Sequence, residues 1–181
     1  MILYFHEIVW PYVCVFDIEH DSGKVFQFSG LMFKRVGDGL YQLCRNVNIY
    51  TQIEISKFIS KFTGISQGFL NHYGQSLVEV IETFNEFRDG IPLDDILFVS
   101  HGAHQDIKML IDNEFPMDGV HYICTHGMAK QILKRAEHLT LGDIAEESGY
   151  LFPAHNAYND ALATAFILSY LLKKKGENDD E

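Results

Sequence analysis

The order of the apolar segments is the feature that most restricts the fold of this chain. Residues 12–18 form a short apolar run rich in β-branched and aromatic side chains, which is typical of a buried central strand. Two more strand-like segments follow, at 24–34 and 40–47, separated by a turn signal. After them helical and strand-like segments alternate. This order predicts an α/β fold with a central mixed five-stranded sheet flanked by helices.

The alternating part of the chain has clear helical patterns. Apolar residues recur at helical spacing from 77 to 87, and residues 156–173 form the longest pattern, apolar on nearly all sides. We expect that last helix to be well buried. The remaining predicted elements are strands at 96–100 and 120–124, helices at 105–114, 128–136 and 139–148, and short helical pieces at 55–62 and 67–72.

Length and composition narrow the class of protein. The 181 residues fit one domain, which we assign to residues 1–174, followed by a charged and frayed tail at 175–181. The net charge of −11 argues against a broad basic surface for duplex nucleic acid, but not against an enzyme that grips a short end. Three dispersed cysteines favour buried free thiols in a reducing compartment over a disulfide framework. Because we recognise no signal peptide or membrane span, we expect a cytoplasmic location and no membrane partner.

A pair of carboxylates closes the first predicted strand. Asp17 and Glu19 lie two residues apart, so their side chains leave the same face of the strand. Two carboxylates this close repel each other unless a cation or a proton lies between them. The pair therefore indicates a ligand site at the mouth of the sheet, although a polar strand end that faces water has the same pattern.

A third carboxylate, Asp106, opens a helix directly after the strand at 96–100. An acid in the first turn of a helix commonly serves only the helix dipole. The strand before it, however, should lie beside the first strand of the mixed sheet. That neighbourhood would bring Asp106 close to Asp17.

The fourth carboxylate, Asp160, lies just past the first turn of the longest helix, which is otherwise almost wholly apolar. Burying an unpaired carboxylate is unfavourable, so Asp160 needs a partner. A metal shared with Asp17 and Glu19 would supply one, and a backbone amide or a lysine is the alternative. His155 precedes this helix on a turn, a suitable position for a general base.

These stretches resemble the three motifs of the DnaQ-like, DEDDh family of 3′→5′ exonucleases, which has a ribonuclease H-like fold. FDIE matches the first motif, SHGAHQD occupies the second, and HNAYNDA matches the third with the histidine of the DEDDh branch. IEISKFISKFTGIS resembles the family's linker with its Thr-Gly-Ile signature, and Cys124-Thr125 sits where the family usually has Asp-Thr. The similarity spans roughly residues 13–172.

Three positions depart from the motifs of the family. His20 replaces the usual threonine after the first-motif glutamate, Gly102 replaces the asparagine of the second motif, and Gln105 replaces its aromatic residue. None of the three is an expected metal ligand. We therefore expect these departures to bear on substrate preference and rate.

The resemblance implies two-metal-ion hydrolysis that releases nucleoside 5′-monophosphates from the 3′ end of DNA or RNA. Asp17, Glu19 and Asp160 would bind one Mg²⁺ or Mn²⁺, Asp17 would bridge to a second ion, and Asp106 would lie close by. His155 would take the proton of the attacking water. The implied partner is a single-stranded 3′ end, and the family also allows a homodimer or a polymerase or processing partner. The expected substrate contacts are Ile18, His20, His101 and Ala103. His20, Phe69, His72 and Tyr73 are candidates for base stacking, although a purely structural role is favoured for each of them, and a core position for Phe69 in particular.

Two other interpretations stay open on the sequence alone. One is a catalytically weak module that binds nucleic-acid 3′ ends within a larger processing or replication assembly. The complete set of five catalytic residues argues against it, whereas His20 and Gly102 keep it open. The other is a zinc protein, although the spacing of its candidate ligands matches no closed tetrahedral site. Those ligands would be His101, His104, His121, Cys124 and His126.

Overall fold

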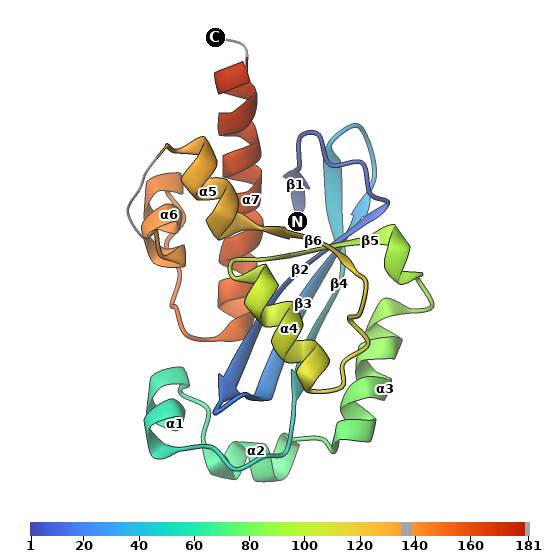
Figure 1. The fold of residues 1–181 in the computed structure, drawn as a ribbon, viewed down its shortest axis with the longest axis vertical. Helices are drawn as coiled ribbons and strands as arrows, with labels where there is room; N and C mark the ends of the chain where they lie inside the picture. The colour runs from blue at the N-terminus through green and yellow to red at the C-terminus, as the bar shows by residue number, and fades with distance from the viewer. Residues whose placement is uncertain (135–138, 180–181) are drawn as a thin grey trace.

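A mixed six-stranded sheet forms the centre of the computed structural model, which describes residues 1–134 and 139–179 (Figure 1). The strand order is β1-β4-β3-β2-β5-β6. The neighbouring pairs β1–β4, β4–β3 and β3–β2 are antiparallel, whereas β5 runs parallel to both β2 and β6. The strands are β1 (Ile2–Tyr4), β2 (Tyr12–Asp21), β3 (Lys24–Arg35), β4 (Leu40–Tyr50), β5 (Ile96–Ser100) and β6 (His121–Cys124).

This arrangement confirms the α/β class and the mixed sheet, but the predicted number of five strands is wrong by one. The additional strand is β1, which pairs with residues 40–42 of β4 at the edge of the sheet. It is only three residues long and is followed by His6 and Glu7. A segment this short carries too little alternation to be recognised as a strand from its sequence.

The described helices begin at clear capping signals. Ser56, Ser66, Ser76 and Thr140 each accept a hydrogen bond from the backbone N–H three residues later, as N-cap side chains do. Gly149 ends α6 in the left-handed conformation, as its position predicts. The helical segments are α1 (Lys57–Thr63), α2 (Gln67–Tyr73), α3 (Leu77–Arg88), the 3-10 turn η1 (Leu93–Asp95), α4 (Ala103–Asp112), α5 (Thr125–Ile132), α6 (Leu141–Ser148) and α7 (Ala157–Asp179).

All of the predicted helices are present, with shifted ends. The helix expected at 105–114 begins two residues earlier as α4. The helix expected at 128–136 is α5, which begins at Thr125 and ends at Ile132, and residues 135 and 136 of the prediction lie outside the described residues.

The boundary placed after residue 174 falls inside α7, because this helix continues to Asp179. Lys174 pairs with Glu177 one turn further on at 3.0 Å, and Lys175 pairs with Glu7. The first pair joins neighbouring turns of α7, and the second ties α7 to the segment after β1, so both support a helix that its composition alone would not favour. Residues 180 and 181 of the predicted tail lie outside the described part of the chain.

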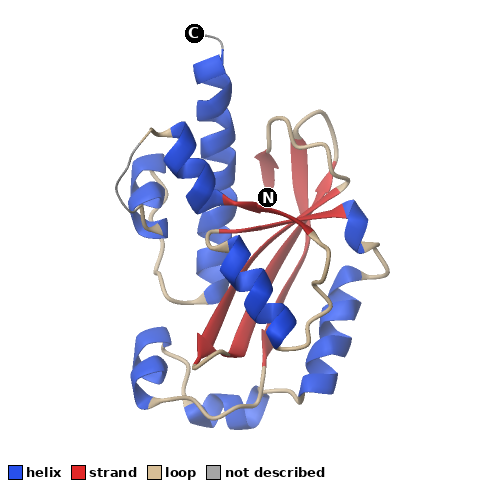
Figure 2. Ribbon diagram, in the orientation of Figure 1, coloured by secondary structure: helices blue, strands red, loops and turns tan. Residues whose placement is uncertain are grey.

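Helices cover both faces of the sheet (Figure 2). On one face α3 and α4 enclose a core that contains Phe16 of β2 and Phe84 of α3. On the other face α7 packs Ala161 against Val15 of β2, and α5 and α6 pack against the outer side of α7. Because side chains alternate along a strand, Asp17 continues the face of β2 that α7 covers.

Two further expectations concern the state of the cysteines and the presence of a membrane-spanning helix. Cys14, Cys44 and Cys124 are free thiols, as predicted, but only Cys14 is buried, whereas Cys124 is partly exposed and Cys44 is exposed. Across residues 1–134 and 139–179, no helix combines the length and the apolar character that crossing a bilayer requires.

Candidate active site

The end of β2 carries two of the expected acids beyond the end of its parallel neighbour. Val15 of β2 lies opposite Val99, one residue before β5 ends. On the other side β3 continues as a partner, with Ser29 opposite Asp17. The acids therefore lie at the carboxyl end of the parallel pair, where open α/β sheets commonly bind ligands.

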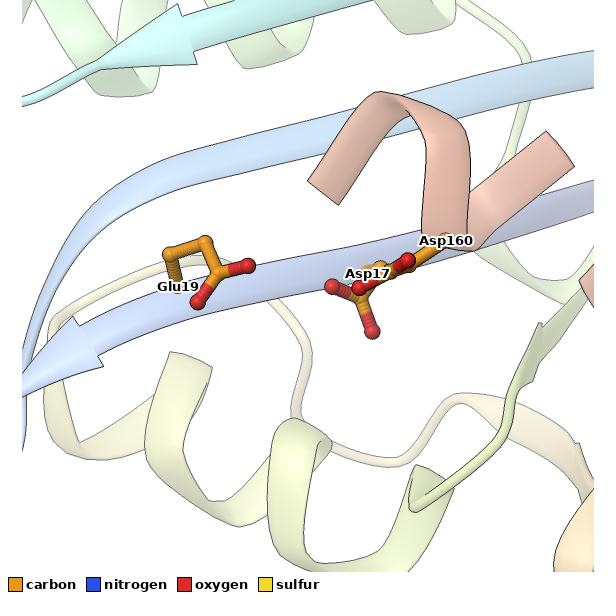
Figure 3. Close-up of side chains that lie close together, drawn as sticks. All are labelled: Asp17, Glu19 and Asp160. Carbon is orange, nitrogen blue, oxygen red and sulfur yellow. The ribbon is translucent and has the colours of Figure 1, made fainter. Parts of the chain in front are cut away.

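Asp160 reaches the same place from the first turn of α7. Each of Asp17, Glu19 and Asp160 offers a carboxylate oxygen that lies within 4.8 Å of the others. Figure 3 shows the three side chains gathered along β2, with Asp160 directed at Asp17. Among the described residues they form the one group of three acidic, histidine or cysteine side chains this close. The structure thus brings together three of the four acids that the motifs predict.

The electrostatics of this group favour a bound cation. Burial raises the pKa of Asp17 well above its usual range, and the charges of Asp106, Asp160 and Glu19 raise it further. Burial, with a contribution from Asp160, raises the pKa of Glu19 to about 7. Burial also raises the pKa of Asp160 to about 6, against the opposing effect of the His155 backbone N–H. Without added positive charge these carboxylates hold protons that they would lose in water, so the site attracts a cation.

The donor atoms themselves fit a hard divalent cation. Asp160 Oδ2 accepts a hydrogen bond from the backbone N–H of His155 at 3.3 Å, whereas Oδ1 is buried and has no hydrogen-bond partner. A buried acceptor left without a partner is destabilising, and a cation would satisfy it. Mg²⁺ and Mn²⁺ both prefer oxygen ligands of this kind. Asp17, Glu19 and Asp160 are therefore suited to hold such an ion.

Asp106 lies beside this group without belonging to the closest three. Since α4 follows β5 almost directly, its first turn places Asp106 near the end of β2, where its charge raises the pKa of Asp17. The hydroxyl of Ser100, the last residue of β5, donates a hydrogen bond to Asp106 Oδ2. Burial raises the pKa of Asp106, and the Ser100 hydrogen bond partly offsets this. Ser100 was not among the predicted site residues, although a serine at the end of a buried apolar strand is a recognisable signal.

His155 lies at the rim of the acid group on the turn before α7. Its φ of 67° is in the left-handed region, which few residues other than glycine adopt. The side chain is exposed, and its ring centroid lies 4.0 Å from that of Phe62 on α1. The turn is thus held by the backbone bond to Asp160 and by a ring contact with α1. The sequence analysis did not identify Phe62.

The predicted substrate contacts have different surroundings. Ile18 and Ala103 are buried, with exposed fractions of 8% and 0%, so their backbone is the part that could face a substrate. His20 is exposed, and its charge lowers the pKa of Asp106. His101 lies between β5 and α4, and its Nδ1 is 3.0 Å from Oγ1 of Thr125 at the start of α5. A role for each of them in substrate binding stays a prediction.

Three of the four stacking candidates, Phe69, His72 and Tyr73, lie on α2, whereas His20 lies on β2. Phe69 packs edge-to-face on Tyr50 at 4.8 Å and borders a small core with Leu70. This agrees with the core position that was favoured for it. His72 and Tyr73 are exposed, and their role as stacking partners stays a prediction.

The zinc interpretation has no ligand group among the described residues. His101, His104, Cys124 and His126 line one cavity of about 500 Å³ beside α4. Their ligand atoms nevertheless form no group of three as close as the acids, and the same holds for His121.

Comparison with known proteins places the chain in a family. The sequence matches the RNase T family of exonucleases over residues 45–168, which is most of its length. The matched segment contains Asp106, His155 and Asp160, whereas Asp17 and Glu19 precede it. Among curated protein sequences no relative was found.

Solved structures show the same fold. The nuclease domain of 3′hExo, a DEDDh family member bound to rAMP, has a TM-score of 0.71 at 14% identity, over 91% of this chain and 92% of that one. Exonuclease X in complex with 5′ overhanging duplex DNA has a TM-score of 0.67 at 16% identity, over 91% and 93%. The zinc-bound E. coli exonuclease I complex with single-stranded DNA has a TM-score of 0.66 at 12% identity, over 94% of this chain and 42% of the other.

The likeness to these structures confirms the ribonuclease H-like fold that the motifs predicted. The sequence match and the shared fold agree. The chain therefore belongs to the RNase T family of exonucleases.

Proposed function

We propose that the protein is a metal-dependent 3′→5′ exonuclease that releases nucleoside 5′-monophosphates from the 3′ end of DNA or RNA. The observation that carries the proposal is the convergence of Asp17, Glu19 and Asp160 within 4.8 Å of one another. His155 stands beside them through its backbone bond to Asp160. The family match supports a nuclease, and the polarity and the product are our proposal.

The four carboxylates would bind the metal ions, and neighbouring polar groups would orient the carboxylates. Asp17, Glu19 and Asp160 would hold one Mg²⁺ or Mn²⁺, and Asp17 and Asp106 would hold a second. When bound, such a pair of ions stabilises the attacking and leaving oxygens of an in-line phosphoryl displacement. Ser100 orients the Asp106 carboxylate through its hydroxyl.

His155 would act as the general base. Its imidazole is exposed at the rim of the site, so it can meet a water molecule that approaches the scissile phosphate. A base in this position accepts the proton as the water attacks, a contribution of roughly a hundred- to ten-thousandfold in rate. The hydrogen bond from the His155 backbone N–H to Asp160 keeps the turn that carries His155 beside the acid group, and it does not depend on the orientation of the imidazole ring.

The substrate would be a single-stranded 3′ end, positioned by His20, by His101 and by the backbone at Ile18 and Ala103. Among the structural neighbours, one is bound to rAMP and another to single-stranded DNA. Both sugars are therefore represented among proteins of this fold. We assign no sugar preference to this chain.

An end-labelled panel of single- and double-stranded DNA and RNA tests the proposal. With Mg²⁺ or Mn²⁺ we expect a ladder that shortens from the 3′ end and yields nucleoside 5′-monophosphates. Asp17→Ala should abolish the ladder, whereas Asp118→Ala, at an exposed acid outside the group, should not. If the wild type and Asp17→Ala are equally inert on every substrate, the exonuclease proposal is overturned.

The alternative is a module that binds 3′ ends with little or no cleavage. The exposed His20, where the family usually has threonine, favours this alternative. The same panel distinguishes the two, since a binding module would retain labelled 3′ ends in a mobility-shift assay without shortening them.

A further inference from the structure

We propose that the outer face of α1 is a platform for the unpaired strand that leads into the active site. Upstream bases would stack on Phe58 and Phe62, and upstream phosphates would lie against Lys57 and Lys61. This inference rests on the proposed exonuclease function and specifies the form of its substrate, a single strand of several nucleotides.

The four residues share one side of a short helix. At about 100° per residue, Lys57, Lys61, Phe58 and Phe62 occupy a continuous arc of roughly 140°. The opposite side carries Ile59, which packs against a small core around Leu70. The outward face is therefore basic along one edge and aromatic along the other.

The two phenylalanines are exposed together. Phe58 has an exposed fraction of 74% and Phe62 of 48%. Their rings are nearly parallel, with centroids 6.1 Å apart and planes inclined by 12°. A single exposed apolar side chain needs no explanation, but adjacent ones often mark an interaction site. Aromatic faces of this kind accept any base and are the usual platform for single-stranded nucleic acid.

The lysines supply the matching charge. Lys57 and Lys61 are exposed, and neither forms an ion pair with a described residue. In a chain with a net charge of −11, these two lysines give the face of α1 a local positive charge. A polyanion with stackable bases matches both the lysines and the rings.

The platform is continuous with the active site. At the start of α1, Asp21 at the end of β2 accepts a hydrogen bond from the backbone N–H of Ser56 at 2.6 Å. At the other end of α1, Phe62 contacts the ring of His155 at 4.0 Å. Helix α1 thus joins the strand that carries the first acids to the turn that carries the base (Figure 1). A strand leaving the site past His155 meets Phe62 first and Phe58 one helical turn later.

This geometry selects for unpaired strands. In a duplex the bases are stacked on one another and cannot offer their faces to protein rings, whereas single strands can. The lysines add attraction that is independent of sequence. We therefore expect binding that depends on strand length and strandedness, and not on base identity.

Binding can be measured without cleavage, by fluorescence anisotropy of a labelled ten-nucleotide strand in the presence of a chelator. We expect Phe58→Ala to weaken binding by roughly 5- to 100-fold, as the loss of one stacked base does. We expect Lys57→Gln with Lys61→Gln to reduce the slope of log affinity against log salt by about 1.4, for two phosphate contacts on a single strand. Val78→Ala on α3 and Lys34→Gln with Lys130→Gln are matched exposed controls and should change neither quantity.

Cleavage provides the second measurement. The loss of kcat/KM caused by Phe58→Ala should be at least about tenfold greater for a ten-nucleotide strand than for a dinucleotide, which is too short to span the platform. If the wild type cleaves nothing, the proposed function fails while the anisotropy still tests the platform. If the wild type cleaves but the α1 variants bind the ten-nucleotide strand as tightly as it does, the platform is overturned. Equal binding of a blunt duplex would also overturn it. So would a loss of self-association in Phe58→Ala, measured by sedimentation, with strand binding unchanged.

Discussion

Asp160, in the first turn of α7, holds a carboxylate oxygen within 4.8 Å of a carboxylate oxygen of Asp17 on β2. The small side chains of Ala161 and Ala165, fully buried on the sheet, let α7 approach β2 this closely. Packing of the apolar core thus forces like charges together. The stability of the site and its chemistry both depend on whether protons or a cation compensate the charge of these carboxylates.

Asp17→Asn replaces one of these carboxyl groups with a group that does not ionise and keeps the shape of the side chain. Without metal ions the variant should melt at a higher temperature than the wild type, because repulsion among the remaining carboxylates is smaller. With Mn²⁺ the order should reverse, since the ion loses a ligand, and cleavage should fall on the order of a thousandfold. Thermal unfolding in chelator and in Mn²⁺ measures both effects, with Asp118→Asn as the control. A variant that Mn²⁺ still stabilises as much as the wild type would contradict the assignment.

The pH dependence of stability follows from the raised pKa values of Glu19, about 7, and Asp160, about 6. In the unfolded chain such groups titrate near pH 4, so between about pH 4 and 7 the native state binds more protons than the unfolded state. Their contribution to stability is therefore complete below about pH 4 and is lost as the pH rises through 7.

In chelator the melting temperature should consequently fall from pH 5 to 8, and Mn²⁺ should stabilise the protein more at pH 8 than at pH 5. Glu19→Gln isolates the effect, because a glutamine does not titrate. As the pH rises, the melting temperature of the wild type should fall further below that of Glu19→Gln. A constant difference would show that Glu19 titrates normally.

His155→Asn separates proton transfer from the architecture of the turn. Asparagine tolerates a positive φ better than most residues and keeps the backbone N–H that binds Asp160. Stabilisation by Mn²⁺ should therefore persist, while kcat falls roughly a hundred- to ten-thousandfold. Single-turnover cleavage and thermal unfolding together check this. Activity within tenfold of the wild type would remove His155 from the mechanism.

Ser100→Ala tests whether the hydrogen bond to Asp106 matters. Losing it should raise the pKa of Asp106 further, because the serine hydroxyl stabilises the charged form. Groups that orient metal ligands typically contribute ten- to a hundredfold, so we expect a loss of roughly that size in activity, relieved at higher pH. Ser148→Ala, which removes a hydroxyl bonded to Ala145 on α6, is the matched control. An unchanged pH profile would argue that Ser100 is merely structural.

The closeness of Asp17, Glu19 and Asp160 could be predicted because their positions contradict the local apolar pattern. Asp17 and Asp160 interrupt segments that otherwise read as buried, and a shared ligand accounts for both. The contact between Phe62 and His155 left no such trace. It depends on how α1 docks against the turn before α7, which no local pattern encodes.

The same distinction explains the errors in the fold. The strands β2 to β6 were recognisable from apolar runs or from alternation, whereas β1 exists because β4 offers it an edge. The direction of the His101 side chain, toward Thr125, is likewise a result of tertiary packing. A sequence motif identifies the residue at each position, but the direction of its side chain depends on the residues that pack around it in the folded protein.

Gly102 is the departure from the family motif that can be tested most directly. Its φ of −116° is open to any residue, and an added Cβ would meet the Asp106 carboxylate oxygens at 3.5 Å, an ordinary contact. Gly102 is also the N-cap of α4, with no side-chain hydrogen bond. Asparagine is a better N-cap than glycine by a few tenths of a kcal/mol, and alanine is worse.

Gly102→Asn should therefore raise the melting temperature by about 1 °C, and Gly102→Ala should lower it. Both variants should cleave within a few-fold of the wild type, because neither side chain displaces Asp106. The order of the three melting temperatures and the rate on a labelled single strand are the measurements. A loss of activity above tenfold in both variants would mean that the space beside Asp106 is needed by the substrate, so that glycine at this position is a functional feature of the site.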